Sequence, residues 1–186
     1  TGLSGNWPTP ANITLFGDDT QQINGELVGV FGSWTFQSEY LVSGLQDARK
    51  AAADPHGTTA VYHGGYVQLL YFLTGEHDHY SKKNGFFERV TPTTNAFWVR
   101  DAGCAGWGAW QVGARYDYLN LNADNRNEAG LNGGILHNIT GGVNCFLNPN
   151  MKVQFNYIAT YRDAPITGNV GDGLVHGWGM RFAHDF

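Results

Sequence analysis

Large apolar residues stand at every second position along much of this chain, and the last segment, HGWGMRFAHDF, shows the pattern most clearly. Trp178, Met180, Phe182 and Phe186 fall on one set of alternate positions, and the polar Arg181 falls on the other. A period of two is typical of a β-strand with one apolar face and one polar face. Chain ends are usually polar and frayed. The segment therefore predicts a C-terminal strand that is held in place by something around it.

Six earlier segments alternate in the same way, which predicts about seven strands in all. Their approximate ranges are 21–31, 34–44, 59–73, 107–120, 135–147 and 151–162. Gly32-Ser33 and Asn148-Pro149-Asn150 predict tight turns between neighbouring strands. Polar, turn-rich stretches predict three long loops, at residues 45–58, 121–134 and 162–173. No segment predicts a long helix, so the chain predicts an all-β, antiparallel fold.

The unequal lengths of the connections between strands distinguish two possible all-β architectures. A soluble β-sandwich packs aliphatic residues between its sheets and has loops of similar length at both ends. Short turns on one rim and long loops on the other are typical of an outer-membrane β-barrel, and aromatic residues near strand ends fit its interfacial girdles. Seven strands alone would leave two unpaired edges in lipid, which is physically unacceptable. We therefore expect 7–8 C-terminal strands of a larger barrel, completed by the rest of the chain or by other envelope chains.

Residues 74–106 lose the alternation and predict a long connector. If the C-terminus is periplasmic, the parity of the strands puts both ends of this connector on the periplasmic side. Thirty-odd residues are too many for a simple turn there. We expect the connector to fold back into the lumen or to cover the rim, unless it contains two short strands. Residues 1–20 predict an irregular lead-in to the barrel domain, residues 21–186.

Composition narrows the classes of function. The 186 residues include 26 Gly, 11 Phe, 9 Tyr and 6 Trp, and the formal net charge is -5. Lys and Arg are scattered, so nucleic-acid binding has little support. No run of about 18 apolar residues predicts a membrane-spanning helix. No nucleophile set, nucleotide-binding loop or pair of carboxylates stands out, so neither an enzyme nor a cofactor is predicted.

Six motifs occur in the following order along the chain: GSWTFQSEYL, GGYVQLLYFLTGEH, KNGFFERVTP, GAWQVGARYDYLNLN, GGVNCFLNPNMKVQFNYIAT and GWGMRFAHDF. Together they resemble the C-terminal half of the phosphate-selective porin (O and P type) family, over about residues 20–186. The resemblance implies a homotrimeric outer-membrane barrel of about sixteen strands, and it favours a fragment because the N-terminal half of the pattern is absent. It also implies that the last strand, ending at Phe186, carries the terminal aromatic signal that barrel-assembly machinery recognises.

Polar residues opposite the apolar strand faces are expected to line the pore. By the alternation they are Glu39, Gln68, Gln111, Arg115, Asp117, Lys152, Gln154, Asn156, Arg181 and Asp185. The alternative is that a water-filled lumen simply needs polar residues, most of which carry no specificity. The family name suggests anions, but this half shows no ladder of arginines or lysines, so a phosphate preference is not predicted.

Other candidates lie in or beside the connector. Lys82, Lys83, Arg89 and Arg100 would form a basic constriction if the connector enters the lumen, or a solvated rim if it does not. Cys104 and Cys145 lie near the same ends of adjacent strands and could form a disulfide in an oxidising periplasm. Glu76, His77, Asp78 and His79 could bind a metal, but we expect a solvated polar run and no metal site. His137, His176 and His184 have no spaced partners and are expected to be structural.

The sequence thus predicts an outer-membrane porin, a passive diffusion channel for small hydrophilic solutes or anions, in contact with membrane lipid. The first alternative is a structural barrel that anchors an envelope assembly and conducts little. A barrel enzyme is a third class, which the missing nucleophile set disfavours. Ion conductance separates the first two readings, and a hydrolysis assay would expose the third.

Overall fold

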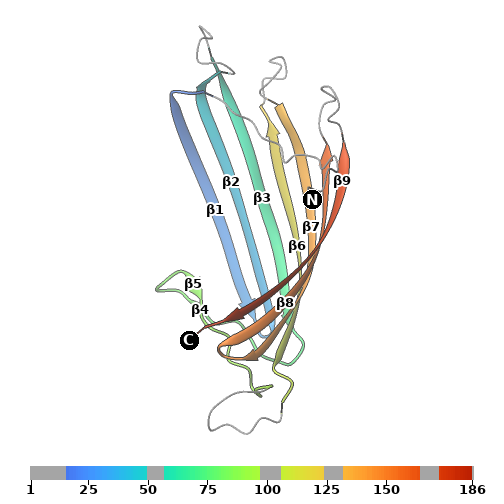
Figure 1. Ribbon diagram of the computed structural model, residues 1–186. Coiled ribbons are helices and arrows are strands. Elements are labelled where there is room, and N and C mark those ends of the chain that lie inside the picture. The colour runs from blue at the N-terminus through green and yellow to red at the C-terminus, as the bar shows by residue number, and fades with distance from the viewer. Residues whose placement is uncertain (1–15, 50–56, 97–105, 124–131, 164–171, 186) are drawn as a thin grey trace.

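The computed structural model describes residues 16–49, 57–96, 106–123, 132–163 and 172–185, and in them the protein is a curved antiparallel sheet (Figure 1). Seven strands pair in the order β1-β2-β3-β6-β7-β8-β9. Their bounds are β1 Asp19–Phe31, β2 Trp34–Ala48, β3 Thr58–Phe72, β6 Ala109–Asn122, β7 Asn132–Asn148, β8 Met151–Asp163 and β9 Gly173–His184. Among the described residues β1 and β9 are not paired with each other, so the sheet is open. It matches the predicted part of a larger barrel.

The strands reach further at the long-loop edge than the alternation indicated. The prediction of a loop over residues 45–58 was wrong at both ends, because β2 continues to Ala48 and β3 begins at Thr58. The pairing is irregular between Leu45 and Ala48, where Asp47 has a positive φ of 52°. After Leu45 the residues of β2 are Gln46, Asp47 and Ala48, which are polar or small, so no alternation marks this end of the strand even though its backbone is paired.

The two predicted tight turns are confirmed. Gly32 follows β1 with a φ of 57°, a left-handed conformation that glycine adopts without a steric penalty. Asn148 ends β7, and its side-chain oxygen accepts a hydrogen bond of 2.8 Å from the backbone N–H of Asn150. Such a bond closes an Asx turn. Both turns lie at the same edge of the sheet as the C-terminal end of β9 (Figure 1).

The register separates the side chains into a polar face and an apolar face. Gln37 of β2, Gln68 of β3 and Arg115 of β6 stand opposite one another on the polar face. The neighbouring row, one residue along each strand, carries apolar residues such as Leu69 on the other face. Trp178 on this apolar face is 83% exposed. A continuous apolar surface of this kind needs an apolar medium or partner to cover it.

The buried side chains lie near the two ends of the strands, here called the long-loop edge and the short-turn edge of the sheet. At the long-loop edge, Ala48, Ala60 and Ala123 form a small buried cluster. At the short-turn edge, Phe72 and Val90 are buried together with Ala109, and Phe146 packs against them. Among the described residues no helix is long and apolar enough to cross a membrane.

The connector between β3 and β6 begins and ends at the short-turn edge, as the parity argument predicted (Figure 1). It contains two short strands, β4 Tyr80–Ser81 and β5 Phe86–Phe87, which pair with each other rather than with the main sheet. Val90 of the connector packs on Phe72 and Ala109. The described part of the connector therefore covers the polar face near this rim.

Candidate pore surface

An ion pair lies at the middle of the polar face. Arg115 and Asp117, neighbours on this face of β6, approach to 2.6 Å, and their side chains are 38% and 27% exposed. The guanidinium carbon of Arg115 is 3.7 Å from the ring centroid of Tyr66 in β3, a cation–π contact. Asp117 also accepts a hydrogen bond of 2.9 Å from Asn138. The arrangement holds both charges flat against the strands.

The polar face is hollowed next to this pair. Four of the predicted pore-lining residues, Gln68, Arg115, Gln154 and Asn156, line one cavity of about 350 Å³. Gln68 donates a hydrogen bond of 2.8 Å to Gln37 across the β2–β3 pair. The structure thus brings these predicted residues onto one water-accessible surface, although their individual roles in transport stay predictions.

A relay of hydrogen bonds runs from β8 to β2 through the connector. Gln154 donates to Asn144 at 2.9 Å, and Asn144 donates to Gln111 at 2.8 Å. Gln111 and Thr35 both donate to one carboxylate oxygen of Asp78, at 3.2 Å and 2.6 Å. Thr35 is 1% exposed, Gln111 3% and Asp78 9%. The connector therefore shields these polar groups from water while supplying the acceptor that satisfies them.

A second acidic side chain of the connector is also buried. Glu76 accepts hydrogen bonds from the hydroxyl of Thr74 and from the backbone N–H of Thr93, the latter at 3.0 Å. Burial alone would raise the pKa of Glu76, but these hydrogen bonds outweigh it and leave the pKa below its usual value. The prediction of a solvated run was wrong for Glu76 and Asp78, because the sequence does not show which loop carboxylates meet donors on the strands.

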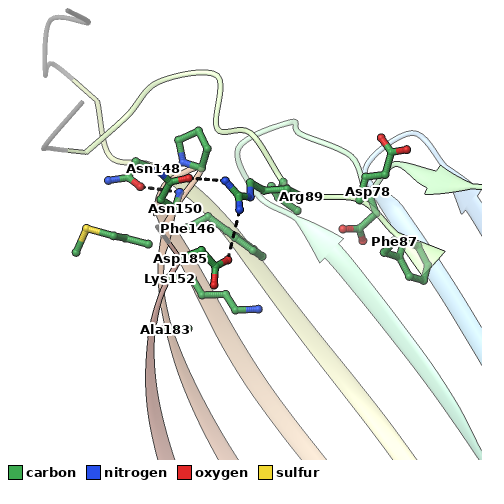
Figure 2. A pocket seen from close by; sticks show the side chains of 13 residues that line it. Asp78, Phe87, Arg89, Phe146, Asn148, Asn150, Lys152, Ala183 and Asp185 are labelled. Atoms are coloured by element: carbon green, nitrogen blue, oxygen red, sulfur yellow. Dashed lines mark hydrogen bonds and ion pairs between the residues drawn. The ribbon is translucent and has the colours of Figure 1, made fainter. Parts of the chain in front are cut away.

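The rim beside the C-terminus holds a basic side chain of the connector (Figure 2). Arg89 donates to Asn150 at 2.5 Å and lies 3.7 Å from the carboxylate of Asp185. These residues, with Lys152 and Phe146, line a cavity of about 320 Å³. The connector thus bonds the sheet at two places, at β2 and β6 through Asp78 and at the β7–β8 turn through Arg89.

The other predicted basic residues are placed differently. Lys82 and Lys83 lie exposed in the turn between β4 and β5, and Arg100 is outside the described residues. Lys152 and Arg181 are on the polar face of β8 and β9, and neither makes an ion pair with any described residue. The basic constriction stays a prediction.

Two further groups of predicted residues concern the apolar face. Trp178, Met180 and Phe182 are 83%, 72% and 57% exposed on the apolar face of β9, as expected, and Phe186 lies outside the described residues. Cys145 is buried opposite Trp110. Because Cys104 also falls outside the described residues, the disulfide stays a prediction.

Sequence reasoning missed a set of tyrosine–histidine pairs on the apolar face. The hydroxyl of Tyr40 lies 2.7 Å from Nδ1 of His63, and the hydroxyl of Tyr116 lies 2.7 Å from Nδ1 of His137. The pair of Tyr157 and His176 repeats the contact at 2.6 Å. The expectation that His137 and His176 have no spaced partners was therefore wrong. These six residues are called the Tyr–His belt below.

A curved antiparallel sheet with one apolar face, one polar face, short turns at one end of the strands and long loops at the other is typical of part of an outer-membrane β-barrel. A family model described as phosphate-selective porin O and P matches residues 5–186. The chain belongs to this porin family.

Relatives agree with this assignment. Porin O of Pseudomonas aeruginosa is 31% identical over 170 residues, which cover 85% of this chain and 34% of Porin O. An uncharacterized protein of Caulobacter vibrioides is 41% identical over 73 residues, which cover 39% of this chain and 13% of that protein. The chain therefore spans about a third of the length of Porin O. Membership in this family agrees with a sheet that forms part of a porin β-barrel.

Proposed function

We propose that this chain contributes one side of a water-filled porin through which small hydrophilic solutes and anions diffuse passively. The observation that carries the proposal is the continuous polar face across seven strands, directly behind an apolar face. A closed sheet with this polarity encloses a polar lumen and presents apolar side chains to lipid. Conduction requires sites that are weak enough to release the solute, and a mixed polar surface meets that requirement.

The charges on the polar face favour only a local preference for anions. Glu39 hydrogen-bonds Asn24 at the β1–β2 side of the sheet, and the Arg115–Asp117 pair compensates itself. Lys152 and Arg181 lie close to each other near the short-turn edge, because Lys152 is two residues from Gln154, the residue opposite Arg181. Their charges are uncompensated among the described residues. This edge is where an anion preference would arise.

The proposed orientation places the short turns, the connector and the C-terminus on the periplasmic side, with the long loops facing outward. Short periplasmic turns and longer external loops are the usual arrangement in such barrels. In this proposal the remaining strands come from the rest of the protein or from other envelope chains, and three such barrels associate.

The test uses the intact protein that carries this chain, reconstituted in planar bilayers. We expect ohmic single-channel currents, and a reversal potential in a KCl gradient that shows a modest anion preference. The double variant Lys152→Glu and Arg181→Glu should shift that preference toward cations. The matched double variant Lys82→Glu and Lys83→Glu adds the same charge in the connector, and a comparable shift there would support the predicted constriction. A correctly assembled protein that carries no current would contradict the proposal and favour an anchoring barrel.

A further inference from the structure

The Tyr–His belt repeats one geometric relation in three separate hairpins. In each hairpin the tyrosine is on the first strand, and the histidine on the second strand lies two residues before the position opposite the tyrosine. The three hairpins are β2–β3, β6–β7 and β8–β9, and the positions opposite the tyrosines are Gly65, Ile139 and Trp178. In all three, the hydroxyl contacts Nδ1 rather than Nε2. Packing within a single hairpin does not require this repetition.

The register places the three histidines at one level around the barrel. His63 stands opposite Asn120, which stands opposite Ile135, and His137 is two residues further along β7. From β7 to β9, again across two strands, the histidine of β9 is two residues further along its strand than the position that the register aligns with the histidine of β7. In a barrel with strands tilted about 35–45° and about 4.8 Å apart, a horizontal line advances about one to one and a half residues per strand. An advance of one residue per strand is therefore close to horizontal.

This level lies toward the long-loop edge of the apolar face. His63 is five residues after the start of β3 at Thr58, and His137 is five after the start of β7 at Asn132. Aromatic contacts continue at this level between the pairs. The ring centroid of Tyr118 lies 5.7 Å from that of His63 and 5.4 Å from that of His137. The belt thus runs along the boundary between the apolar band and the polar strand ends, the depth at which headgroups meet a barrel.

The apolar face offers the imidazoles no protein counter-charge. On this face of the described strands, the Asp, Glu, Lys and Arg residues are Asp19 and Asp163, both at the long-loop ends of their strands. The other titratable groups beside the histidines are tyrosine hydroxyls of the belt, with Tyr118 and Tyr161 between them. A cationic imidazole here would find its anion outside the protein.

The hydrogen bonds to tyrosine occupy Nδ1 of each ring and leave Nε2 as its second polar atom. In a neutral imidazole, a tyrosine hydroxyl that donates to Nδ1 leaves the ring proton on Nε2, and in the cation both nitrogens carry a proton. Nε2 of His63 lies 3.2 Å from the side-chain nitrogen of Asn120. Nε2 of His137 and of His176 makes no hydrogen bond within the described part of the chain. We propose that the Tyr–His belt binds the phosphate groups of anionic lipids at the long-loop side of the membrane.

Lipid fits the belt better than a second copy of the chain. A neighbouring subunit would have to cover six consecutive strands, from β2 to β9, to contact all three pairs. Lipid headgroups surround a barrel at that level on every side that other subunits leave open. The amphipathic tyrosine ring suits the same boundary, since its body is apolar and its hydroxyl is polar.

The test presents the intact protein with equal amounts of phosphatidylglycerol and phosphatidylcholine of matched acyl chains, and native mass spectrometry counts the lipids that remain bound. Histidine side chains in general gain charge between about pH 8 and pH 5. One charge at a membrane surface changes the attraction of anionic lipid about fivefold. We therefore expect the ratio of bound phosphatidylglycerol to phosphatidylcholine to rise at least about fivefold from about pH 7.5 to about pH 5.5.

The triple variant His63→Gln, His137→Gln and His176→Gln should lose this rise, because glutamine keeps a polar partner for each tyrosine without titrating. His79→Gln, in the connector, is the matched control and should keep the rise. Added inorganic phosphate should not displace the bound lipid. If the triple variant does not assemble, the single variant His176→Gln decides, since His176 is exposed, and it should lose part of the rise.

Three results would overturn the proposal: an unchanged pH-dependent ratio in the histidine variants, an equal loss in His79→Gln, or a change in oligomeric state without a change in lipid binding. The last would assign the belt to contact between copies. Channel conductance is a separate readout, so failure here leaves the proposed transport function untouched.

Discussion

Replacing Asp78 by alanine is the sharpest perturbation of the link between the connector and the sheet. One carboxylate oxygen of Asp78 accepts hydrogen bonds from Thr35 at 2.6 Å and from Gln111 at 3.2 Å. Both donors are almost completely buried, so water cannot replace the acceptor while the connector stays in place. Asp78→Ala therefore removes two bonds and leaves two donors unsatisfied.

The magnitude follows from the burial of the three groups. A hydrogen bond to a charged partner contributes about 1.5–3 kcal/mol, and a buried donor left without a partner costs a similar amount. The lower end of two such losses is about 3 kcal/mol, because alanine also relieves the cost of burying a carboxylate. A loss of about 3 kcal/mol raises the population of the opened connector about 150-fold.

Hydrogen exchange of the connector in the intact protein measures this population. The backbone N–H groups of Glu88 and Thr93, bonded to His79 and Glu76 at 2.7 Å and 3.0 Å, report opening. They should exchange about 100-fold faster or more in Asp78→Ala, while strand amides of the apolar band keep their rates.

Asp185→Ala is the control for this experiment, because it removes a carboxylate that also meets the connector. The Arg89–Asp185 pair is 3.7 Å apart with side chains 52% and 70% exposed, and such pairs contribute little. Equal acceleration in Asp185→Ala and Asp78→Ala, or none in Asp78→Ala, would refute the reasoning from burial.

Three further predictions concern stability. Glu76→Gln should make the connector less sensitive to acid. Because the pKa of Glu76 is lowered in the folded protein, its stabilising effect is complete above the usual carboxyl range and is lost as pH falls through the lowered value. Connector amides of the wild type should therefore exchange faster on acidification, and those of the variant much less so. Gly32→Val should reduce the free energy of unfolding in urea by about 1–2 kcal/mol, because a β-branched residue is strained at positive φ, while Gly32→Asn should cost less than half as much. Phe72→Ala should cost about 3–5 kcal/mol in the same assay, because Phe72 is 1% exposed, whereas Phe86→Ala, at a side chain 53% exposed, should cost less than about 1 kcal/mol.

The strands and their faces could be predicted because a period of two fixes both at once. Once Gln68 is assigned to the polar face, Leu69 must lie on the other, and the observed register keeps this assignment across all seven strands. The prediction weakened at the strand ends. Around Gln46 and Asp47 neither face is apolar, so backbone pairing continues without any hydrophobic pattern to reveal it.

The polar face could be predicted as a surface but not as a network. Alternation assigned Gln111 and Gln154 to the lumen side, yet gave no reason to connect them with Asp78, which comes from an irregular segment. The Tyr–His belt was hidden for a related reason. Its pairs are separated by 23, 21 and 19 residues in the sequence, because the intervening loops and strand ends differ in length. A spatial repeat without a fixed sequence spacing leaves no motif.

The distribution of buried groups explains why the connector is bonded so strongly to the rim. A sheet that faces lipid on one side and water on the other has no second layer to pack against, so its own strands bury few large side chains. Phe72 and Thr35 are the largest fully buried side chains of the described residues, and both lie at the short-turn edge. There the connector supplies the missing layer, with Val90 against the aromatic cluster and Asp78 against the polar donors. The connector reaches from β2 to the β7–β8 turn through Asp78 and Arg89. We therefore predict that the contacts that stabilise this edge also restrict the opening of the pore, so that a change at Asp78 alters both stability and conductance.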